Sequence, residues 1–137
     1  MASRTAHLAK LLGLYCIVFA VVMLARQETT IAAVRALMAD PPLVLVSGIA
    51  ALGIGLAIVL AHNVWSGGAL PVVVTLVGWL SAMKGIVLLW LSPSAVLAYY
   101  DALHYDRYFV FYAVGTLVLG IYLTYAGART GSGRGSM

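Results

Sequence analysis

Charged side chains are scarce in this sequence. Only 9% of its 137 residues are charged and 64% are hydrophobic, whereas soluble domains carry about 25% charged residues. The acidic residues all lie outside the long apolar runs: Glu28, Asp40, Asp101 and Asp106. This composition excludes an ordinary soluble domain and predicts an integral membrane protein. The net charge of +4 then indicates orientation across a membrane rather than nucleic-acid binding.

Cysteine and clustered histidine are also missing. Cys16 is the single cysteine, so an intramolecular disulfide is excluded. His7, His62 and His104 are scattered without metal-ligand spacing, which argues against a zinc or iron–sulfur site. No nucleophile and base stand at a spacing typical of catalysis. The sequence therefore predicts no metal, no cofactor and no catalytic residue.

Long apolar runs dominate the sequence instead. They cover residues 11–25, 43–61, 70–91 and 108–126, and Leu8 and Ala9 in front bring the first to spanning length. A helix needs roughly 17–25 residues to cross a hydrocarbon core of about 30 Å. Since peptide groups in lipid must be satisfied internally, each crossing segment is expected to be a helix. We predict an all-α membrane protein with four transmembrane helices in a single domain, residues 1–126, that needs the lipid bilayer as its partner.

The first apolar run has a second interpretation. It follows a basic start containing Arg4, as in a secretory signal peptide. The cleavage pattern is poor, because Met23 stands where the first small residue is expected before Ala25 and Arg26. A retained helix is the favoured interpretation.

Two connecting segments are predicted to be helices that lie at the membrane surface. In residues 26–42, apolar side chains recur at helical spacing from Ile31 onward, and Thr29 or Thr30 offers an N-cap. Pro41-Pro42 ends this pattern, and an ordinary loop is the alternative. Residues 92–107 show a similar pattern with several tyrosines. The Gly/Ser-rich residues 127–137 predict a flexible tail.

A shift of 65 residues places one half of the chain on the other without a gap. Ile31 then falls on Val96, and Gly55 falls on Gly120. Apolar sequences also match by chance, but the order of elements repeats as well. The pattern predicts two tandem repeats of span, interfacial helix and span, at about 8–61 and 73–126. Each repeat has an even number of spans, so both share one orientation.

The basic residues favour one orientation of the chain. The side with both termini and the 62–69 hairpin carries four basic residues and no acid: Arg4, Lys10, Arg129 and Arg134. The other side carries three basic residues and all four acids. The positive-inside rule therefore predicts cytoplasmic termini. The difference of one basic residue leaves dual topology open.

Lys84 is the only charge inside an apolar run. A charge in a span is costly and is usually paired or lines a cavity. Lys84 lies seven residues before Leu91, roughly 10 Å along the helix. One interpretation is a lysine that snorkels toward an outer-face carboxylate, namely Asp101, Asp106, Glu28 or Asp40. The other is an anion or proton site inside the bundle or at a subunit contact.

Four further residues are candidates for ligand contact. His62 and Asn63, beside Trp65, can either cap the second span or contact a headgroup or ligand. Tyr108 and Tyr112 share a helix face at i, i+4 and can belong to an interfacial aromatic belt or touch a ligand. Capping and the aromatic belt are the commoner roles.

Small residues mark one face of each of the two central spans. They predict close helix packing, because hydrophobicity does not hold helices together in lipid. The packing residues are Ser47, Gly48, Ala51, Gly55, Gly78, Ala82 and Gly85.

The motif His62-Asn63-x-Trp65 followed by Gly78-Trp79-x4-Lys84-Gly85 resembles short bacterial four-span membrane proteins without assigned activity. The resemblance implies a multi-pass protein of the bacterial cytoplasmic membrane and brings no catalytic residues. The acidic span residue of small multidrug transporters is missing here.

Three functions are compatible with these patterns. The leading hypothesis is a non-enzymatic protein that acts by helix packing, as a homo-oligomer or an accessory subunit of a membrane complex. The alternative is a small-solute or anion channel or transporter that uses Lys84. The third is a lipid-modifying membrane enzyme that uses His62 or His104.

Overall fold

The computed structural model describes residues 2–132. Over this range its regular secondary structure is entirely α-helical, which confirms the all-α part of the predicted fold class. The helices are α1 (Ala2–Ala25), α2 (Gln27–Ala39), α3 (Pro41–Ala61), α4 (Ala69–Trp90), α5 (Pro93–Ala102) and α6 (Tyr105–Ser132). Of these, α1, α3, α4 and α6 are long and apolar enough to cross a membrane. They correspond to the four predicted runs.

The helices at both ends of the chain are longer than the apolar runs. α1 begins at Ala2 rather than near residue 8, and α6 continues to Ser132 through the stretch predicted to be flexible. Gly127 is buried against α1, where an added Cβ would lie 3.0 Å from the Ala6 carbonyl oxygen. This contact supports the last turns of α6. Residues 133–137, the rest of the predicted tail, lie outside the described residues.

α2 and α5 are the two short helices expected between the spans. α2 begins at Gln27 directly after Arg26, with no capping side chain, so Thr29 and Thr30 lie inside the helix and the predicted N-cap is wrong. The reason is that α1 runs to Ala25 and only one residue joins the helices. Pro41 opens α3, and Asp40 Oδ1 accepts the Leu43 N–H at 3.2 Å.

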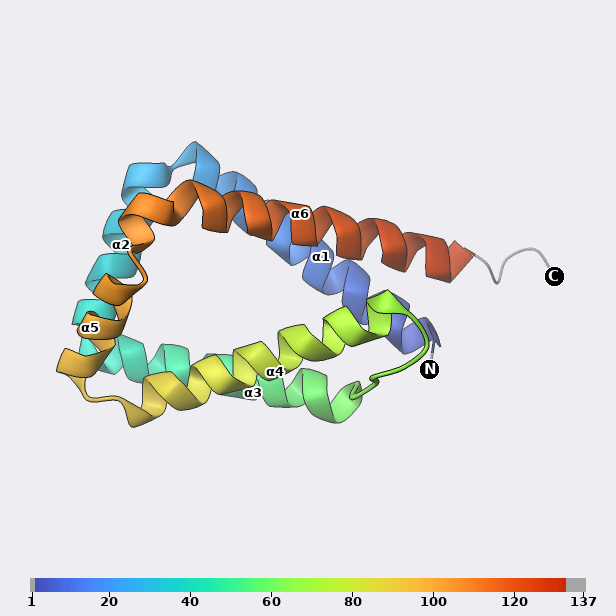
Figure 1. The fold of residues 1–137 in the computed structure, drawn as a ribbon, viewed down its shortest axis with the longest axis horizontal. Helices are drawn as coiled ribbons and strands as arrows, with labels where there is room; N and C mark the ends of the chain where they lie inside the picture. The colour runs from blue at the N-terminus through green and yellow to red at the C-terminus, as the bar shows by residue number, and fades with distance from the viewer. Residues whose placement is uncertain (1, 133–137) are drawn as a thin grey trace.

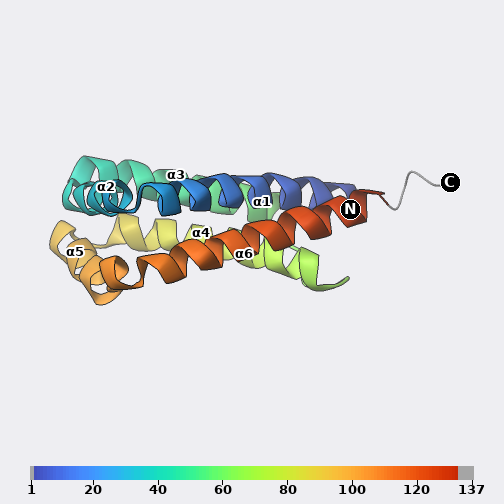
Figure 2. The ribbon, with the colours of Figure 1, turned by 90° about the horizontal axis from the view of Figure 1, so that it is seen from above.

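The four long helices form two pairs. α1 packs along α6, and α3 packs along α4 (Figure 1, Figure 2). The pairs converge at the end that holds the N-terminus of α1, the C-terminus of α6 and the 62–68 loop, and they diverge toward α2 and α5. α2 and α5 lie across the wide end and contact each other. We call these two ends the convergent end and the wide end.

Each pair is held at close range by glycines. In the α3–α4 pair, a Cβ added to Gly55 would lie 2.6 Å from the Ala82 Cα. In the α1–α6 pair, a Cβ added to Gly120 would lie 2.8 Å from the Gly13 carbonyl oxygen and 2.9 Å from the Ile17 backbone nitrogen. Real Cβ atoms do not approach so closely, so these helix backbones touch because the side chains are absent.

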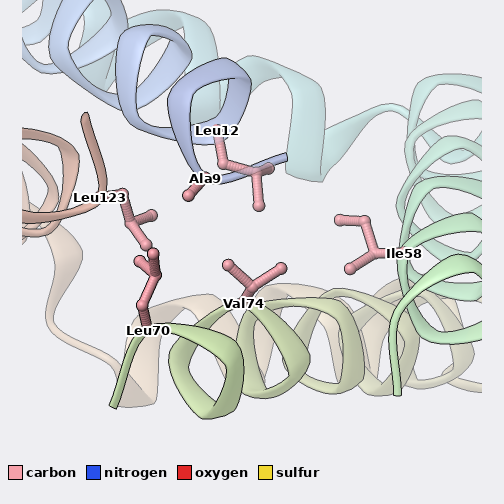
Figure 3. Close-up of a cluster of buried hydrophobic side chains, with 6 residues drawn as sticks. All are labelled: Ala9, Leu12, Ile58, Leu70, Val74 and Leu123. Carbon is pink, nitrogen blue, oxygen red and sulfur yellow. The ribbon is translucent and has the colours of Figure 1, made fainter. Parts of the chain in front are cut away.

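Side chains from all four long helices meet at the convergent end (Figure 3). Leu12 and Ala9 come from α1, Ile58 from α3 and Leu123 from α6, and two residues of α4 complete the cluster. The members are Ala9, Leu12, Ile58, Leu70, Val74 and Leu123, and each is at most 9% exposed. We call this the convergent cluster. It fills the space between the two pairs at this end.

Candidate functional site

A cavity of about 610 Å³ lies between the two helix pairs on the side of α2 and α5. Residues from α1, α2, α4, α5 and α6 line it, and most of them are apolar. Leu80 in its lining lies one turn along α4 from Val77, which packs against the convergent cluster. On this side the cavity therefore borders side chains that pack around the convergent cluster.

Lys84 is the one charged residue among the described residues that line this cavity. Its side chain is exposed, and within residues 2–132 its ammonium makes neither a hydrogen bond nor an ion pair. Two of the four acidic candidates bind elsewhere. Asp106 lies 3.9 Å from Arg35, and Asp40 caps α3. The predicted tie to a carboxylate is not formed.

A group of tyrosines lines the cavity together with Lys84. The rings of Tyr105 and Tyr112 are stacked, with centroids 5.5 Å apart and an interplanar angle of 21°. The Tyr112 hydroxyl donates to the Leu103 carbonyl at 3.3 Å. Tyr99 and Tyr105 also line the cavity, and in the described part of the chain their hydroxyls have no hydrogen-bond partner.

Tyr100 joins this group to the charged surface of the wide end. It is only 4% exposed, and its hydroxyl donates to Asp106 Oδ1 at 2.9 Å. Burial, followed by the hydrogen bond to Asp106 and the negative charge of that carboxylate, raises the pKa of Tyr100 to about 12. Tyr100 therefore stays a neutral donor and holds Asp106 in place, beside Arg35 and away from Lys84.

The structure separates the two tyrosines that were predicted together. Tyr112 lines the cavity, whereas Tyr108 is not among the lining residues. The Arg107 guanidinium lies 5.9 Å from the centre of the Tyr108 ring, and that ring also contacts Phe111. Of this pair, only Tyr112 belongs with Lys84.

His62 and Asn63 lie at the convergent end, away from Lys84. His62 is 3% exposed; its Nδ1 lies 3.4 Å from Thr5 Oγ1, and its Nε2 has no partner within residues 2–132. Asn63 Oδ1 accepts hydrogen bonds from the indoles of Trp65 at 2.8 Å and Trp79 at 3.5 Å. These side chains face α1 and the indoles rather than the last carbonyls of α3. They fix the loop.

Thr75 is a structural residue that was not predicted from the sequence. It is fully buried in α4, and its hydroxyl accepts the Val64 N–H at 3.1 Å. Its own proton faces the carbonyls of Pro71 and Val64, both at 3.0 Å, and that of His62 at 3.3 Å. A hydroxyl within an apolar run was the available signal. It anchors the 62–68 loop onto α4.

Phe19 is a second residue of structural interest that is not among the candidates predicted from the sequence. It lines the cavity from α1, stacked on Tyr15 with ring centroids 6.0 Å apart. The 65-residue shift relates it to Lys84, since 84 − 65 = 19. That relation to the charged position is the signal in the sequence that points to Phe19.

The predicted packing residues lie in or beside the α3–α4 contact. Five of them are buried in the helix pair: Gly48, Gly55, Gly78, Ala82 and Gly85. Ser47 and Ala51 are half-buried, and the Ala51 carbonyl accepts the Ser81 hydroxyl at 2.9 Å. These small residues therefore pack helices within one chain, and they do not form a free face for a second copy.

Nothing among residues 2–132 gathers three metal-ligating side chains. His104 Nδ1 lies 2.9 Å from the Ala102 carbonyl at the sharp turn into α6, where His104 has a φ of 49°. Comparison with protein-family models, curated proteins and solved structures gives no significant match. The cavity and Lys84 are therefore the features of the described chain that bear most directly on function.

Proposed function

We propose that this chain is a non-enzymatic multi-pass membrane protein that binds a small anionic molecule between its helix pairs, with Lys84 as the binding charge. One observation carries the proposal: Lys84 lines an apolar cavity, and no described residue supplies its counter-charge. An unpaired cation at membrane depth is costly unless it faces water or a ligand. A bound anion supplies the missing partner.

Insertion into the bacterial cytoplasmic membrane is part of this proposal. Its support is the number of large apolar side chains exposed on the long helices, such as Leu60 at 84%, Phe111 at 75% and Trp90 at 87%. In water such surfaces drive association, whereas in lipid they are solvated. Both termini then face the cytoplasm with the convergent end, and α2 and α5 face the outside.

We also propose that the chain consists of two tandem repeats, α1–α3 and α4–α6. Support comes from contacts that recur after the 65-residue shift. The contact of Gly55 with Ala82 is equivalent to the contact of Gly120 with Ile17. The shift relates Gly55 to Gly120 (55 + 65 = 120) and Ile17 to Ala82 (17 + 65 = 82). One apolar cluster contains Met23 and Phe109 with Ile31 packed against it, and the shifted residues form another. The shifted residues are Leu88, Val44 and Val96.

In this proposal the two repeats are interleaved. Each helix pair contains the first span of one repeat and the last span of the other, because α1 packs on α6 and α4 packs on α3. The cavity then lies at the approximate twofold axis between equivalent elements. Phe19 and Lys84 occupy equivalent places on its two sides.

Binding is better supported than conduction. A channel would need a continuous polar path from one end of the bundle to the other. The convergent cluster closes the space between the pairs with side chains such as Val74 and Leu123, both fully buried (Figure 3). We therefore propose a site that opens sideways, between helices, rather than a pore along the bundle.

The test is to identify small molecules that stay bound after purification in a mild non-ionic detergent. We expect mass spectrometry to find an anionic molecule on the wild type and on Lys84→Arg, and to find it lost from Lys84→Met. Lys10→Met is the matched control, because Lys10 is exposed at the convergent end, outside the cavity. Equal amounts on wild type and Lys84→Met, or no anionic molecule on the wild type, would contradict the proposal.

Action by packing, as a homo-oligomer or an accessory subunit, is the second proposal. It is favoured by a surface groove of about 410 Å³ between α1 and α2, which Val22, Ala33 and Leu37 help to line. A second copy or another subunit lying in this groove would cover its apolar side chains. Light scattering in detergent tests this: a monomer, or an oligomer that persists in Ala33→Glu, would contradict it.

A further inference from the structure

We infer that the ligand of the Lys84 cavity is a long-chain monocarboxylate, that is, a fatty acid in its ionised form. This inference rests on the proposed anion site and specifies the class of molecule that occupies it. Three features carry it: the single charge, the apolar lining, and the depth of Lys84 along α4.

Within residues 2–132, the cavity has one cationic side chain in its lining, which can balance a single negative charge on a ligand. Lys84 alone among the described lining residues is charged, and no arginine lines the cavity. The nearby arginines are engaged: Arg35 lies 3.9 Å from Asp106, and Arg107 lies over Tyr108. A phosphate monoester carries close to two charges and is preferentially held by arginine forks or backbone N–H groups. One lysine balances one carboxylate.

The lining matches an apolar chain rather than a small hydrated anion. Around Lys84 the cavity is lined by Leu80, Met83 and Val87 of α4, and Phe19 lines it from α1. A hydrated inorganic anion would lose its water against these side chains without replacement hydrogen bonds. An alkyl chain gains free energy from the same contacts. The asymmetry between Lys84 and its equivalent Phe19 suits a molecule with one acidic end and one apolar body.

The depth of Lys84 matches the position of an amphiphile in a bilayer. Lys84 lies six residues before Trp90, the last residue of α4, or roughly 9 Å from the wide end. Its side chain can extend toward the interface while its methylenes stay in apolar surroundings. The acid group then lies near the headgroup level, where Tyr99 and Tyr105 offer free hydroxyl donors. Leu80 at 65% and Met83 at 58% are exposed, so the chain can enter from the lipid side.

The experiment measures binding to the full chain in nanodiscs of zwitterionic lipid, using microscale thermophoresis. The probes are palmitate, hexadecanol with the same chain and no charge, hexadecyl phosphate with a different acid, and acetate with no chain. Palmitate is expected to bind wild type and Lys84→Arg, and to bind Lys84→Met at least about tenfold more weakly, as when one partner of a partly desolvated ion pair is removed. Lys10→Met should bind it like wild type.

The other possible outcomes show whether the fatty-acid inference alone fails or whether the proposed anion site fails with it. If acetate or hexadecyl phosphate binds through Lys84 more tightly than palmitate, the fatty-acid inference is overturned and the anion site stands. If hexadecanol binds as tightly as palmitate, the charge plays no part and both fail. If no anion distinguishes wild type from Lys84→Met, both fail as well. A further check needs no variant: it compares the affinities of palmitate and the shorter octanoate for the wild type. Equal affinities would overturn the role of the apolar lining.

Discussion

Gly55 of α3 touches the backbone of Ala82 of α4 because neither residue has a side chain large enough to separate the helices. A Cβ at Gly55 would lie 2.6 Å from the Ala82 Cα. Close approach of this kind is the main source of helix association where lipid replaces water. We expect Gly55→Ala to destabilise the protein by about 1–3 kcal/mol, the range for overpacked sites. Thermal unfolding in detergent measures the loss.

Gly53→Ala is the matched control for that substitution. Gly53 lies in the same helix and has nothing within 4 Å of its would-be Cβ. Alanine favours a helix over glycine by about 1 kcal/mol, so this variant should be as stable as wild type or more stable. Equal losses in the two variants would show that the α3–α4 contact is not at Gly55. Gly120→Ala and Gly115→Ala form the same comparison in α6.

The interleaved pairing predicts that the two halves of the chain assemble after separation. Fragments 1–66 and 67–137, cut in the loop at Gly67, should co-purify when they are expressed together. α1 of the first fragment needs α6 of the second, and α3 needs α4. Affinity purification through a tag on one fragment measures the association. A Gly120→Leu change in the second fragment should weaken it; fragments that never associate would contradict the pairing.

Thr75 should be sensitive to loss of its hydroxyl. Thr75→Val keeps the shape of the side chain but leaves the Val64 N–H without its acceptor. An unsatisfied buried donor costs about 1–3 kcal/mol, so the melting temperature should fall. Thr75→Ser keeps the hydroxyl and should retain most of the stability. A Val variant as stable as the Ser variant would remove the anchoring role.

Tyr100 should make stability depend on alkaline pH. Its folded pKa is raised to about 12, above the usual value near 10. Folding therefore favours the neutral phenol, and this contribution is complete below about pH 10 and is lost as pH rises toward 12. Two pKa units correspond to at most about 3 kcal/mol. Melting temperatures of wild type and Tyr100→Phe, compared from pH 8 to 12, should converge; parallel curves would contradict the assignment.

The topology can be tested by labelling from one side of the membrane. In a Cys16→Ser background, Ser66→Cys lies in the loop at the convergent end and Ser94→Cys lies in α5 at the wide end. An impermeant maleimide added to intact cells should label Ser94→Cys and spare Ser66→Cys. Labelling of both positions at similar levels would indicate dual topology, and the reverse pattern would invert the proposed orientation.

The glycine contacts between helices also explain why part of the site could not be predicted from the sequence. The glycine at position 55 predicts a close helix contact but does not say with which helix. The same is true of Gly13 and Gly120, which meet each other across more than a hundred residues. Lys84 was recognisable as unusual from its charge alone. That Asp106, one of its candidate partners, is held by Tyr100 and Arg35 instead is a tertiary arrangement.

The sequence by itself determined the six helices, because the length of each apolar run, Gly67-Gly68 and the prolines near residues 41, 71 and 93 act on the local backbone. It did not determine the length of α1 and α6 at the chain ends, where Gly127 is held by contact with α1. The pairing of α1 with α6, the burial of His62 and the cavity around Lys84 were decided only by the tertiary structure. The physical reason is that apolar helices are similar in composition on every side, so their partners are selected by shape over long sequence distances.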